Sequence, residues 1–203
     1  EPFDVAHEFL RQILKGVSLA GFEYEMSTEE ANMYVTAVNT ALKEAMAQKF
    51  FPVRKVVRPF IWRLNESRKR LRQFSRNVLD HYHSIEDPQE CTIISMIVSN
   101  DSYLSDEERL TDIGVFFSAA YETTSYTLAW TLLELAKNPT EQTILRNALR
   151  DVQVNERRNV PELRRALKEG MRLNPVTAIG AHRVLANDFT TDKYFLPKGM
   201  IVT

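Results

Sequence analysis

The chain has 203 residues, of which 44% are hydrophobic and 26% are charged, and its formal net charge is −1. This length is enough for one domain with a sizeable core. The near-zero net charge gives no overall electrostatic case for binding nucleic acid or an anionic membrane. Cys91 is the only cysteine, so the sequence excludes an internal disulfide.

Helical periodicity dominates the first part of the chain. Apolar residues recur at helical spacing through "PFDVAHEFLRQILKGVSLAGF", which predicts a helix that ends near Gly21. Ser27 and Glu30 form a capping box, so a second helix is expected from there to about Phe50. Residues 61–84 predict a third helix with a basic face, which we interpret as solvated because no overall basicity or aromatic interleaving indicates nucleic-acid binding.

A long central helix is the main feature of the middle of the chain. Before it, residues 91–100 fit a short buried helix or a buried strand, since periodicity alone does not separate the two. Ser105 and Glu108 form a second predicted capping box, and the helix that follows is expected to reach residue 137, a length of about 50 Å. Its central part carries one charge, Glu122, among several Ser and Thr residues, which favours the core of an α-domain over a membrane span.

The last part of the chain changes character. "PTEQTILRNALRDV" and "NVPELRRALKEGMRLNP" predict two more helices, the second with Asn159 as N-cap and Pro161 in the first turn. Alternation and Pro-Lys-Gly turn signals then predict short strands. We therefore expect a mainly α fold with a small β region, in one partial domain: residues 1–180 mostly helical and residues 181–203 in short strands. Because it opens with Glu and ends in a predicted strand, the chain is expected to be a piece of a longer protein.

Two residue pairs stand out chemically. Glu122 and Thr123 place a carboxylate beside a hydroxyl, and Thr123 and Thr124 are expected to bond back to carbonyls one turn earlier. Such a pair can relay protons into a buried site, although a Glu on one wet stripe of the helix fits the segment equally well. Glu169 and Arg172 lie three residues apart and share a helix face, which by itself is typical of an ordinary surface ion pair.

Taken in order, several motifs resemble the cytochrome P-450 superfamily: "AAYETTS", "KNPTEQ", "KEGMRLNP", "HRVLANDF" and "FLPKGMIV". The resemblance covers essentially the whole chain, from the helix that the family calls E to the strands after helix K. It implies an incomplete cytochrome P-450-like helical fold. For the parent protein it implies a haem-thiolate monooxygenase that uses dioxygen to hydroxylate a small hydrophobic substrate, with electrons from a redox partner, either a reductase or a ferredoxin.

The resemblance assigns the haem-side roles to individual residues. Glu122 and Thr123 match the acid–alcohol pair that supplies protons for dioxygen activation. Ala119 and Ala120 match the positions beside the haem, where the family usually has Gly in place of Ala120. Arg183 matches the arginine that pairs with a haem propionate, a task suited to the guanidinium fork.

The resemblance also assigns structural and substrate-contacting residues. Glu169 and Arg172 match the Glu-x-x-Arg pair of helix K, whose role in the family is structural. The residues expected to line the substrate pocket are Phe116, Tyr121, Val176, Ile179 and Ala181.

Parts of the family pattern are not found in this sequence. The axial-cysteine loop, which contains Phe-x-x-Gly, and the upstream Trp-x-x-x-Arg helix are absent, and Cys91 lacks the glycines expected around the ligand. The span before "VPELRR" is shorter than usual, which suggests missing residues near 150–160. We expect this chain alone to be inactive, and the alternative is a non-enzymatic helical interaction protein with a P-450-derived fold.

No metal ligand set is predicted, because His81 and His83 would point about 200° apart on a helix.

Some properties of the parent are not predicted by the sequence. These are its substrate, electron donor, membrane association and localisation. The basic residues between 54 and 76 are interpreted as a solvated face in preference to a reductase-docking face.

Overall fold

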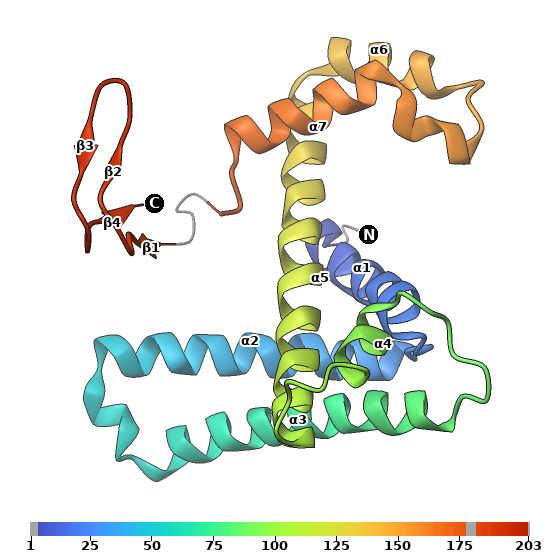
Figure 1. Ribbon diagram of the computed structural model, residues 1–203. Helices are drawn as coiled ribbons and strands as arrows, with labels where there is room; N and C mark the ends of the chain where they lie inside the picture. The colour runs from blue at the N-terminus through green and yellow to red at the C-terminus, as the bar shows by residue number, and fades with distance from the viewer. Residues whose placement is uncertain (1–3, 178–181, 203) are drawn as a thin grey trace.

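The computed structural model describes residues 4–177 and 182–202, and it confirms a mainly α fold with a small C-terminal β region. The longest helix, α5 (Asp106–Lys137), runs through the middle of the molecule (Figure 1). The other helical elements are α1 (Val5–Phe22), α2 (Thr28–Phe50), the 3-10 turn η1 (Pro52–Lys55), α3 (Arg58–Ser84), α4 (Ile93–Val98), α6 (Pro139–Leu149), the 3-10 turn η2 (Val154–Asn159) and α7 (Pro161–Leu173).

The helices pack against the two ends of α5. Figure 1 shows α2 and α3 as a hairpin, joined through η1, that crosses the first half of α5, with α1 beside the same half. Helices α6 and α7 lie at the opposite end, where α7 packs against α5. The end of the hairpin that carries η1 projects away from this junction.

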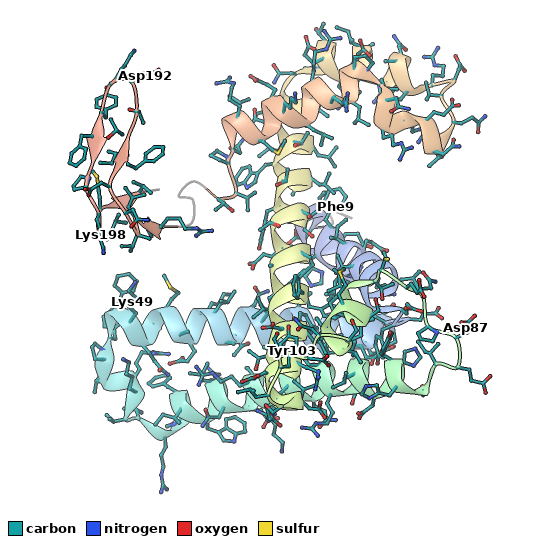
Figure 2. All side chains as sticks on the ribbon, in the orientation of Figure 1. Phe9, Lys49, Asp87, Tyr103, Asp192 and Lys198 are labelled. Atoms are coloured by element: carbon teal, nitrogen blue, oxygen red, sulfur yellow. The ribbon has the colours of Figure 1, made fainter. Side chains whose placement is uncertain are left out.

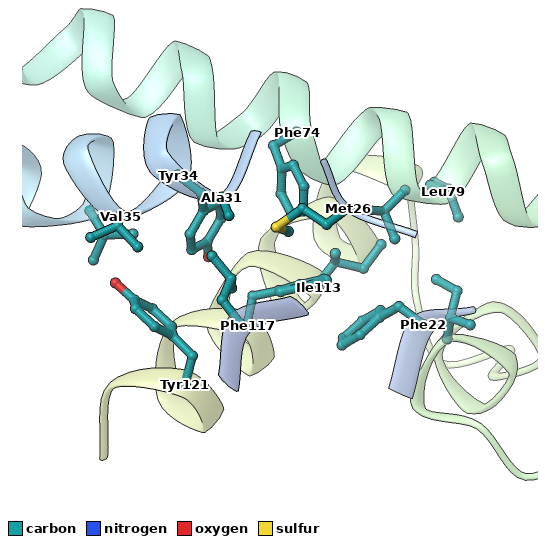
Figure 3. Close-up of a cluster of buried hydrophobic side chains, with 14 of the residues drawn as sticks. Phe22, Met26, Ala31, Tyr34, Val35, Phe74, Leu79, Ile113, Phe117 and Tyr121 are labelled. Atoms are coloured by element: carbon teal, nitrogen blue, oxygen red, sulfur yellow. The ribbon is translucent and has the colours of Figure 1, made fainter. Parts of the chain in front are cut away.

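The core is an aromatic cluster at the crossing of α1, α2, α3 and α5 (Figure 3). Phe117 of α5 stacks on Phe22 with ring centroids 4.1 Å apart and meets Phe74 of α3 edge-on at 5.0 Å. Tyr34 of α2 lies edge-on to Phe74 at 4.9 Å, and its hydroxyl donates to the Gly114 carbonyl at 3.3 Å. Offset and edge-on aromatic pairs stabilise a core beyond the area that they bury, so this cluster positions the first half of α5.

The capping box at the start of α2 is confirmed, whereas the one predicted for α5 is wrong. Ser27 Oγ accepts from the Glu30 amide at 3.1 Å, and the Glu30 carboxylate accepts from the Ser27 amide at 3.0 Å. At α5, the Ser105 side chain makes no capping bond. The Glu108 carboxylate reaches past Ser105 and accepts from the Leu104 amide at 2.8 Å, so neither bond of the reciprocal motif forms.

The starts of α7 and α4 were not fully predicted by the sequence. Helix α7 has Val160 as its N-cap residue rather than Asn159, because Asn159 ends the preceding turn η2; Pro161 opens the helix as expected. The ambiguous segment 91–100 contains helix α4, whose N-cap Thr92 accepts from the Ser95 amide.

Of the helices in the described ranges, none is both long and apolar enough to span a bilayer.

Four strands of two residues each form two antiparallel pairs, which confirms the predicted strand region. Strand β1 (Arg183–Val184) pairs with β4 (Ile201–Val202), and β2 (Phe189–Thr190) pairs with β3 (Phe195–Leu196). Figure 1 shows these strands standing apart from the helices.

Candidate functional site on helix α5

One side of α5 carries small and aromatic side chains and faces away from the core. Phe116, Ala119, Thr123 and Trp130 are all exposed, and their spacing places them in one stripe along the helix. We call these four residues the open face of α5. Ala120 lies at its edge and is half-buried. Three of the residues assigned by the resemblance, Phe116, Ala119 and Thr123, therefore share one surface.

The hydroxyl of Thr123 bonds back along its own helix, as predicted. Thr123 Oγ1 donates to the Ala119 carbonyl at 2.9 Å, and the same bond repeats from Thr127 to Thr123 and from Thr131 to Thr127, each at 2.8 Å. A hydroxyl has one proton but two acceptor positions. Thr123 therefore keeps its capacity to accept a hydrogen bond on the exposed side of the helix.

Glu122 is half-buried, between the open face and the core. Burial is the main reason that the pKa of the Tyr121 phenol is raised, and the negative charge of Glu122 adds to this effect. The Glu122 carboxylate is thus close enough to the core for its charge to act there. It also adjoins Thr123 in sequence, and the two side chains point about 100° apart around the helix, so the acid lies beside the open face rather than on it.

Tyr121 does not lie where the resemblance placed it. It is only 1% exposed and packs edge-on against Tyr34 with ring centroids 5.9 Å apart, so it belongs to the core (Figure 3). Since each residue turns a helix by about 100°, Tyr121 points about 160° away from Thr123. It cannot line a pocket together with Phe116 and Ala119.

The remaining predicted pocket and propionate residues lie after α7. Val176 is 37% exposed, and Ile179 and Ala181 fall outside the described residues. Arg183 lies on β1 with an exposed side chain, and its Nη1 donates to the His182 carbonyl at 3.3 Å. The guanidinium has five donors, so most of them remain for an anionic partner.

Glu169 and Arg172 form a two-pronged ion pair on α7. Arg172 Nε and Nη2 donate to the two Glu169 carboxylate oxygens at 2.8 and 2.6 Å. The hydrogen bonds from Arg172 hold the pKa of the Glu169 carboxyl below its ordinary value. Both side chains are exposed, and Glu169 lies at the rim of a hollow of about 680 Å³ between α5, α6 and α7.

Sequence reasoning missed two positions at this end of the molecule. Trp130 extends the open face by two turns, and its spacing of seven residues from Thr123 was the available signal. Gly170 of α7 sits directly against Thr131 of α5, a long-range contact for which the sequence carries no local signal.

The open face fits one side of a haem group. Ala119 and Ala120 offer methyl groups between the larger Phe116 and Trp130, so a flat group can approach this part of the helix closely. The described residues do not supply an axial ligand at this surface, because Cys91 lies in the loop before α4, exposed and with a φ of 66°. No cluster of three His, Cys, Asp or Glu side chains suited to a metal ion occurs in the ranges 4–177 and 182–202.

Comparison with known proteins gives a consistent result. A family model described as Cytochrome P450 matches residues 3–203. "Probable cytochrome P450 508C1" of Dictyostelium discoideum is 27% identical over 164 residues, which cover 70% of this chain and 33% of the relative. "1,25-dihydroxyvitamin D(3) 24-hydroxylase, mitochondrial" of Rattus norvegicus is 33% identical over 116 residues, which cover 52% of this chain and 22% of the relative.

The fold comparison agrees with the family match. The solved structure "Crystal structure of a Cytochrome P450 (CYP102L1)" superimposes with a TM-score of 0.75 at 21% identity, covering 98% of this chain and 50% of that one. The chain spans about half the length of such structures and 33% and 39% of its first two curated relatives. A family model that matches almost every residue nevertheless decides the assignment: the chain belongs to the cytochrome P450 family.

Proposed function

We propose that this chain supplies the proton-delivering side of the haem site in a monooxygenase that oxidises a small hydrophobic substrate. Membership of the family implies the haem cofactor. The observation that carries the proposal is the exposed Thr123 hydroxyl on the open face of α5, beside the small residues Ala119 and Ala120 and next in sequence to the half-buried Glu122. "Hydroxylase" in the names of curated relatives supports the class of reaction.

Each residue of the open face has a task in this proposal. Haem, when bound with an axial thiolate, supplies the activation of dioxygen. Thr123 holds a polar oxygen at the surface that the haem would face and accepts a hydrogen bond there. Glu122 takes up protons from its wetter side and passes them toward the Thr123 hydroxyl. Phe116 and Ala119 bind and orient the apolar substrate, and they exclude bulk water from the reacting atoms.

The axial ligand has to come from residues other than those described, since Cys91 is remote from the open face in sequence and lies in an exposed loop. We therefore propose that the 203-residue chain does not turn over by itself. Arg183 would pair with a haem propionate, and a reductase or ferredoxin would deliver the electrons. The apolar side chains of the open face favour a hydrophobic substrate, and dioxygen is the second substrate.

The test uses the full-length protein that contains this chain. Its reduced form should bind carbon monoxide and give the shifted Soret band of a thiolate-ligated haem. Thr123→Ala and Glu122→Gln should retain that spectrum and lower product formation about 10²–10⁴-fold, the usual contribution of a positioned proton donor. Oxygen consumption should fall less than product formation, because electrons continue to enter while proton delivery fails.

Thr124→Ala is the matched control, since Thr124 is the adjacent exposed threonine but lies on the other side of Thr123 and points about 160° away from Glu122 around the helix. It should leave the ratio of product to oxygen consumed unchanged. A full-length protein without the carbon monoxide spectrum would contradict the monooxygenase proposal and favour the non-enzymatic helical alternative. Equal losses in Thr123→Ala and Thr124→Ala would contradict the role given to Thr123.

A further inference from the structure

The hollow between α5, α6 and α7 has the size of a small-molecule site. Its volume of about 680 Å³ lies within the range of about 300–1,000 Å³ that is usual for ligand pockets. Figure 1 shows α6 and α7 at the C-terminal end of α5, whereas Tyr103 and the α2–α3 hairpin lie toward the other end (Figure 2). Glu134, which lines the hollow, lies about 16 Å along the helix axis from Thr123, because each residue of an α-helix rises about 1.5 Å. The hollow is therefore well removed from the Thr123 hydroxyl.

The walls of the hollow carry apolar side chains from all three helices. Helix α5 contributes Leu135, α6 contributes Ile144 and Leu145, and α7 contributes Ala166 and Leu173. Ile144 and Leu173 are 48% and 46% exposed, although both line a concave surface. Single exposed apolar residues need no explanation, but a group that lines one concavity offers area that a ligand can cover.

The charged side chains around these walls are mostly acidic. One cation, Arg165, lines the hollow together with four carboxylates, those of Glu134, Glu141, Glu162 and Glu169. Lys137 Nζ donates to Glu134 at 2.9 Å, and Arg165 Nη2 donates to Glu162 at 2.6 Å. Glu141 forms no ion pair within the described part of the chain. The hollow therefore combines apolar walls with an excess of negative charge.

The cations that pair with Glu134 and Glu162 are loosely held. Lys137 and Arg165 are 57% and 73% exposed, and each lies three residues from its acid on the same helix. Exposed pairs of this kind contribute little to stability, so a ligand cation can replace either side chain at small cost. Hydrogen bonds, first from Lys137 and then from Asn174, hold the pKa of the Glu134 carboxyl below its ordinary value, which keeps this group anionic at neutral pH.

The directions of the helices add to the negative potential. Helices α5 and α7 both end at the hollow, with Leu135 and Leu173 in their last turns, whereas only α6 begins there. The C-terminal end of a helix carries a partial negative charge and favours cations. Two such ends against one N-terminal end leave a net attraction for positive charge.

We propose that this hollow binds a small organic cation, an ammonium or amidinium group attached to an apolar body. The positive group contacts the carboxylates of Glu134 and Glu141. The apolar body lies against Leu135, Ile144 and Leu173, which removes their exposed area from water. A protein partner would instead need a much larger contact surface than a hollow of this volume provides. This inference does not depend on the proposed monooxygenase activity.

Calorimetric titration of the full-length protein with three probes tests the proposal. The probes share one phenylbutyl body: trimethyl(4-phenylbutyl)ammonium, 4-phenylbutanol and 4-phenylbutyrate. The quaternary nitrogen has no lone pair, so the ammonium probe cannot coordinate a haem iron. It should bind about tenfold more tightly than the alcohol, since each of two partly exposed carboxylates contributes about threefold. The carboxylate probe should bind most weakly, and added salt should weaken only the binding of the ammonium probe relative to the alcohol.

Substitutions around the hollow should change affinity in opposite directions. Glu134→Gln with Glu141→Gln should lower affinity for the ammonium probe about tenfold and leave affinity for the alcohol unchanged. Arg165→Gln should raise affinity for the ammonium probe about two- to fivefold, because it releases Glu162 and removes a competing cation. A disturbed fold cannot produce that gain. Ala166→Phe should weaken the binding of both probes, because the added ring fills the hollow.

Two control variants separate this site from other surfaces. Glu156→Gln removes an exposed carboxylate from η2 outside the hollow, and it should bind the ammonium probe within about twofold of the parent protein. Phe116→Ser alters the surface proposed for the monooxygenase substrate and should also leave that affinity unchanged. Failure of the two proposals can therefore be told apart.

Three results would overturn the proposal. The first is equal affinity for the ammonium probe and the alcohol, unchanged by Glu134→Gln with Glu141→Gln. The second is the absence of binding of any probe to the folded full-length protein. The third is a loss of ammonium binding in Phe116→Ser but not in the double acid variant, which would assign the probe to the open face of α5.

Discussion

Gly170 of α7 lies directly against Thr131 of α5. A Cβ atom built on Gly170 would stand 2.3 Å from Thr131 Oγ1 and 3.0 Å from Thr131 Cβ. Real Cβ atoms do not approach other atoms so closely, so α7 packs on α5 at this point only because residue 170 has no side chain. The Glu169–Arg172 pair stands beside this contact, and the position of the pair therefore depends on the glycine.

Gly170→Ala is expected to destabilise the chain by about 1–3 kcal/mol, the usual cost of inserting a methyl group into a packed contact. Urea unfolding followed by circular dichroism measures the change. Gly16→Ala in α1 is the matched control, because nothing lies within 4 Å of a Cβ atom built there. That substitution should stabilise the chain by about 0.5–1 kcal/mol through helix propensity.

The double variant Thr131→Ala with Gly170→Ala tests whether the clash is the cause. Removing Oγ1 leaves Thr131 Cβ as the closest atom, so part of the lost stability should return. The two substitutions should then be non-additive by more than about 0.5 kcal/mol. Additive effects would show that Gly170→Ala acts on helix α7 itself.

Sequence alone predicted the parts of the fold whose signals are local. The capping box at Ser27 and Glu30 is confirmed: the Tyr24 hydroxyl donates to Glu30 Oε1, and Glu30 Oε2 remains to accept from the Ser27 amide. At Ser105 the same sequence pattern does not form a capping box, because the Glu108 carboxylate accepts from the Leu104 amide instead of the Ser105 amide. The contact between Gly170 and Thr131 joins residues that are far apart in sequence, and no spacing rule could have predicted it.

The candidate site was predicted only in part, for a similar reason. The bond from Thr123 to the Ala119 carbonyl follows from one turn of helix, and the structure confirms that bond. Tyr121 was placed by its motif position rather than by its helix face. The row Phe117, Tyr121 and Ser125, at four-residue spacing, already indicated that this side of the helix is the one that packs into the core.

Of the substitutions predicted to affect stability, the loss of the Phe117 ring from the aromatic core is expected to have the largest effect. Phe117 is fully buried and stacks on Phe22. Phe117→Ala should lower the free energy of unfolding by about 3–5 kcal/mol, because it removes apolar burial and leaves a cavity. Phe195→Ala, at a position that is 62% exposed, is the control and should stay within about 0.5 kcal/mol of the parent in the same denaturation experiment. A loss below 1 kcal/mol for Phe117→Ala would show that the cluster is loosely packed.

The Tyr34 hydroxyl joins α2 to α5 inside the core. It lies 3.0 Å from Ser118 Oγ and donates to the Gly114 carbonyl, and burial raises the pKa of this phenol to about 12. Tyr34→Phe keeps the ring and removes the hydrogen bonds, so it should cost about 1 kcal/mol. In Tyr34→Phe the Ser118 hydroxyl has lost its Tyr34 partner. Ser118→Ala should therefore lower the free energy of unfolding less in the Tyr34→Phe background than in the parent protein. Equal losses in both backgrounds would contradict the coupling between the two hydroxyls.

The Glu44–Arg54 ion pair is expected to make the hairpin sensitive to acid. Hydrogen bonds from Arg54, more than those from Gln48, hold the pKa of the Glu44 carboxyl below its ordinary value of 4.5. Because the folded state binds this proton less readily than the unfolded state, the pair stabilises the fold fully above pH 4.5. That contribution is lost as the pH falls through the lowered folded-state value.

Glu44→Gln cannot titrate at this position and keeps the size of the side chain. The variant should be less stable than the parent protein at neutral pH, and the difference should shrink as the pH falls below 4.5. Urea unfolding at a series of pH values measures how the free energy of unfolding of the variant and of the parent protein depends on pH. The control Glu25→Gln, at an exposed loop position, should have the same free energy of unfolding as the parent at every pH. Arg54→Lys should reproduce part of the loss at neutral pH, because an ammonium group cannot make the two-pronged contact. A stability difference that stays constant from neutral to acid pH would mean that Glu44 contributes through its packing rather than through its charge.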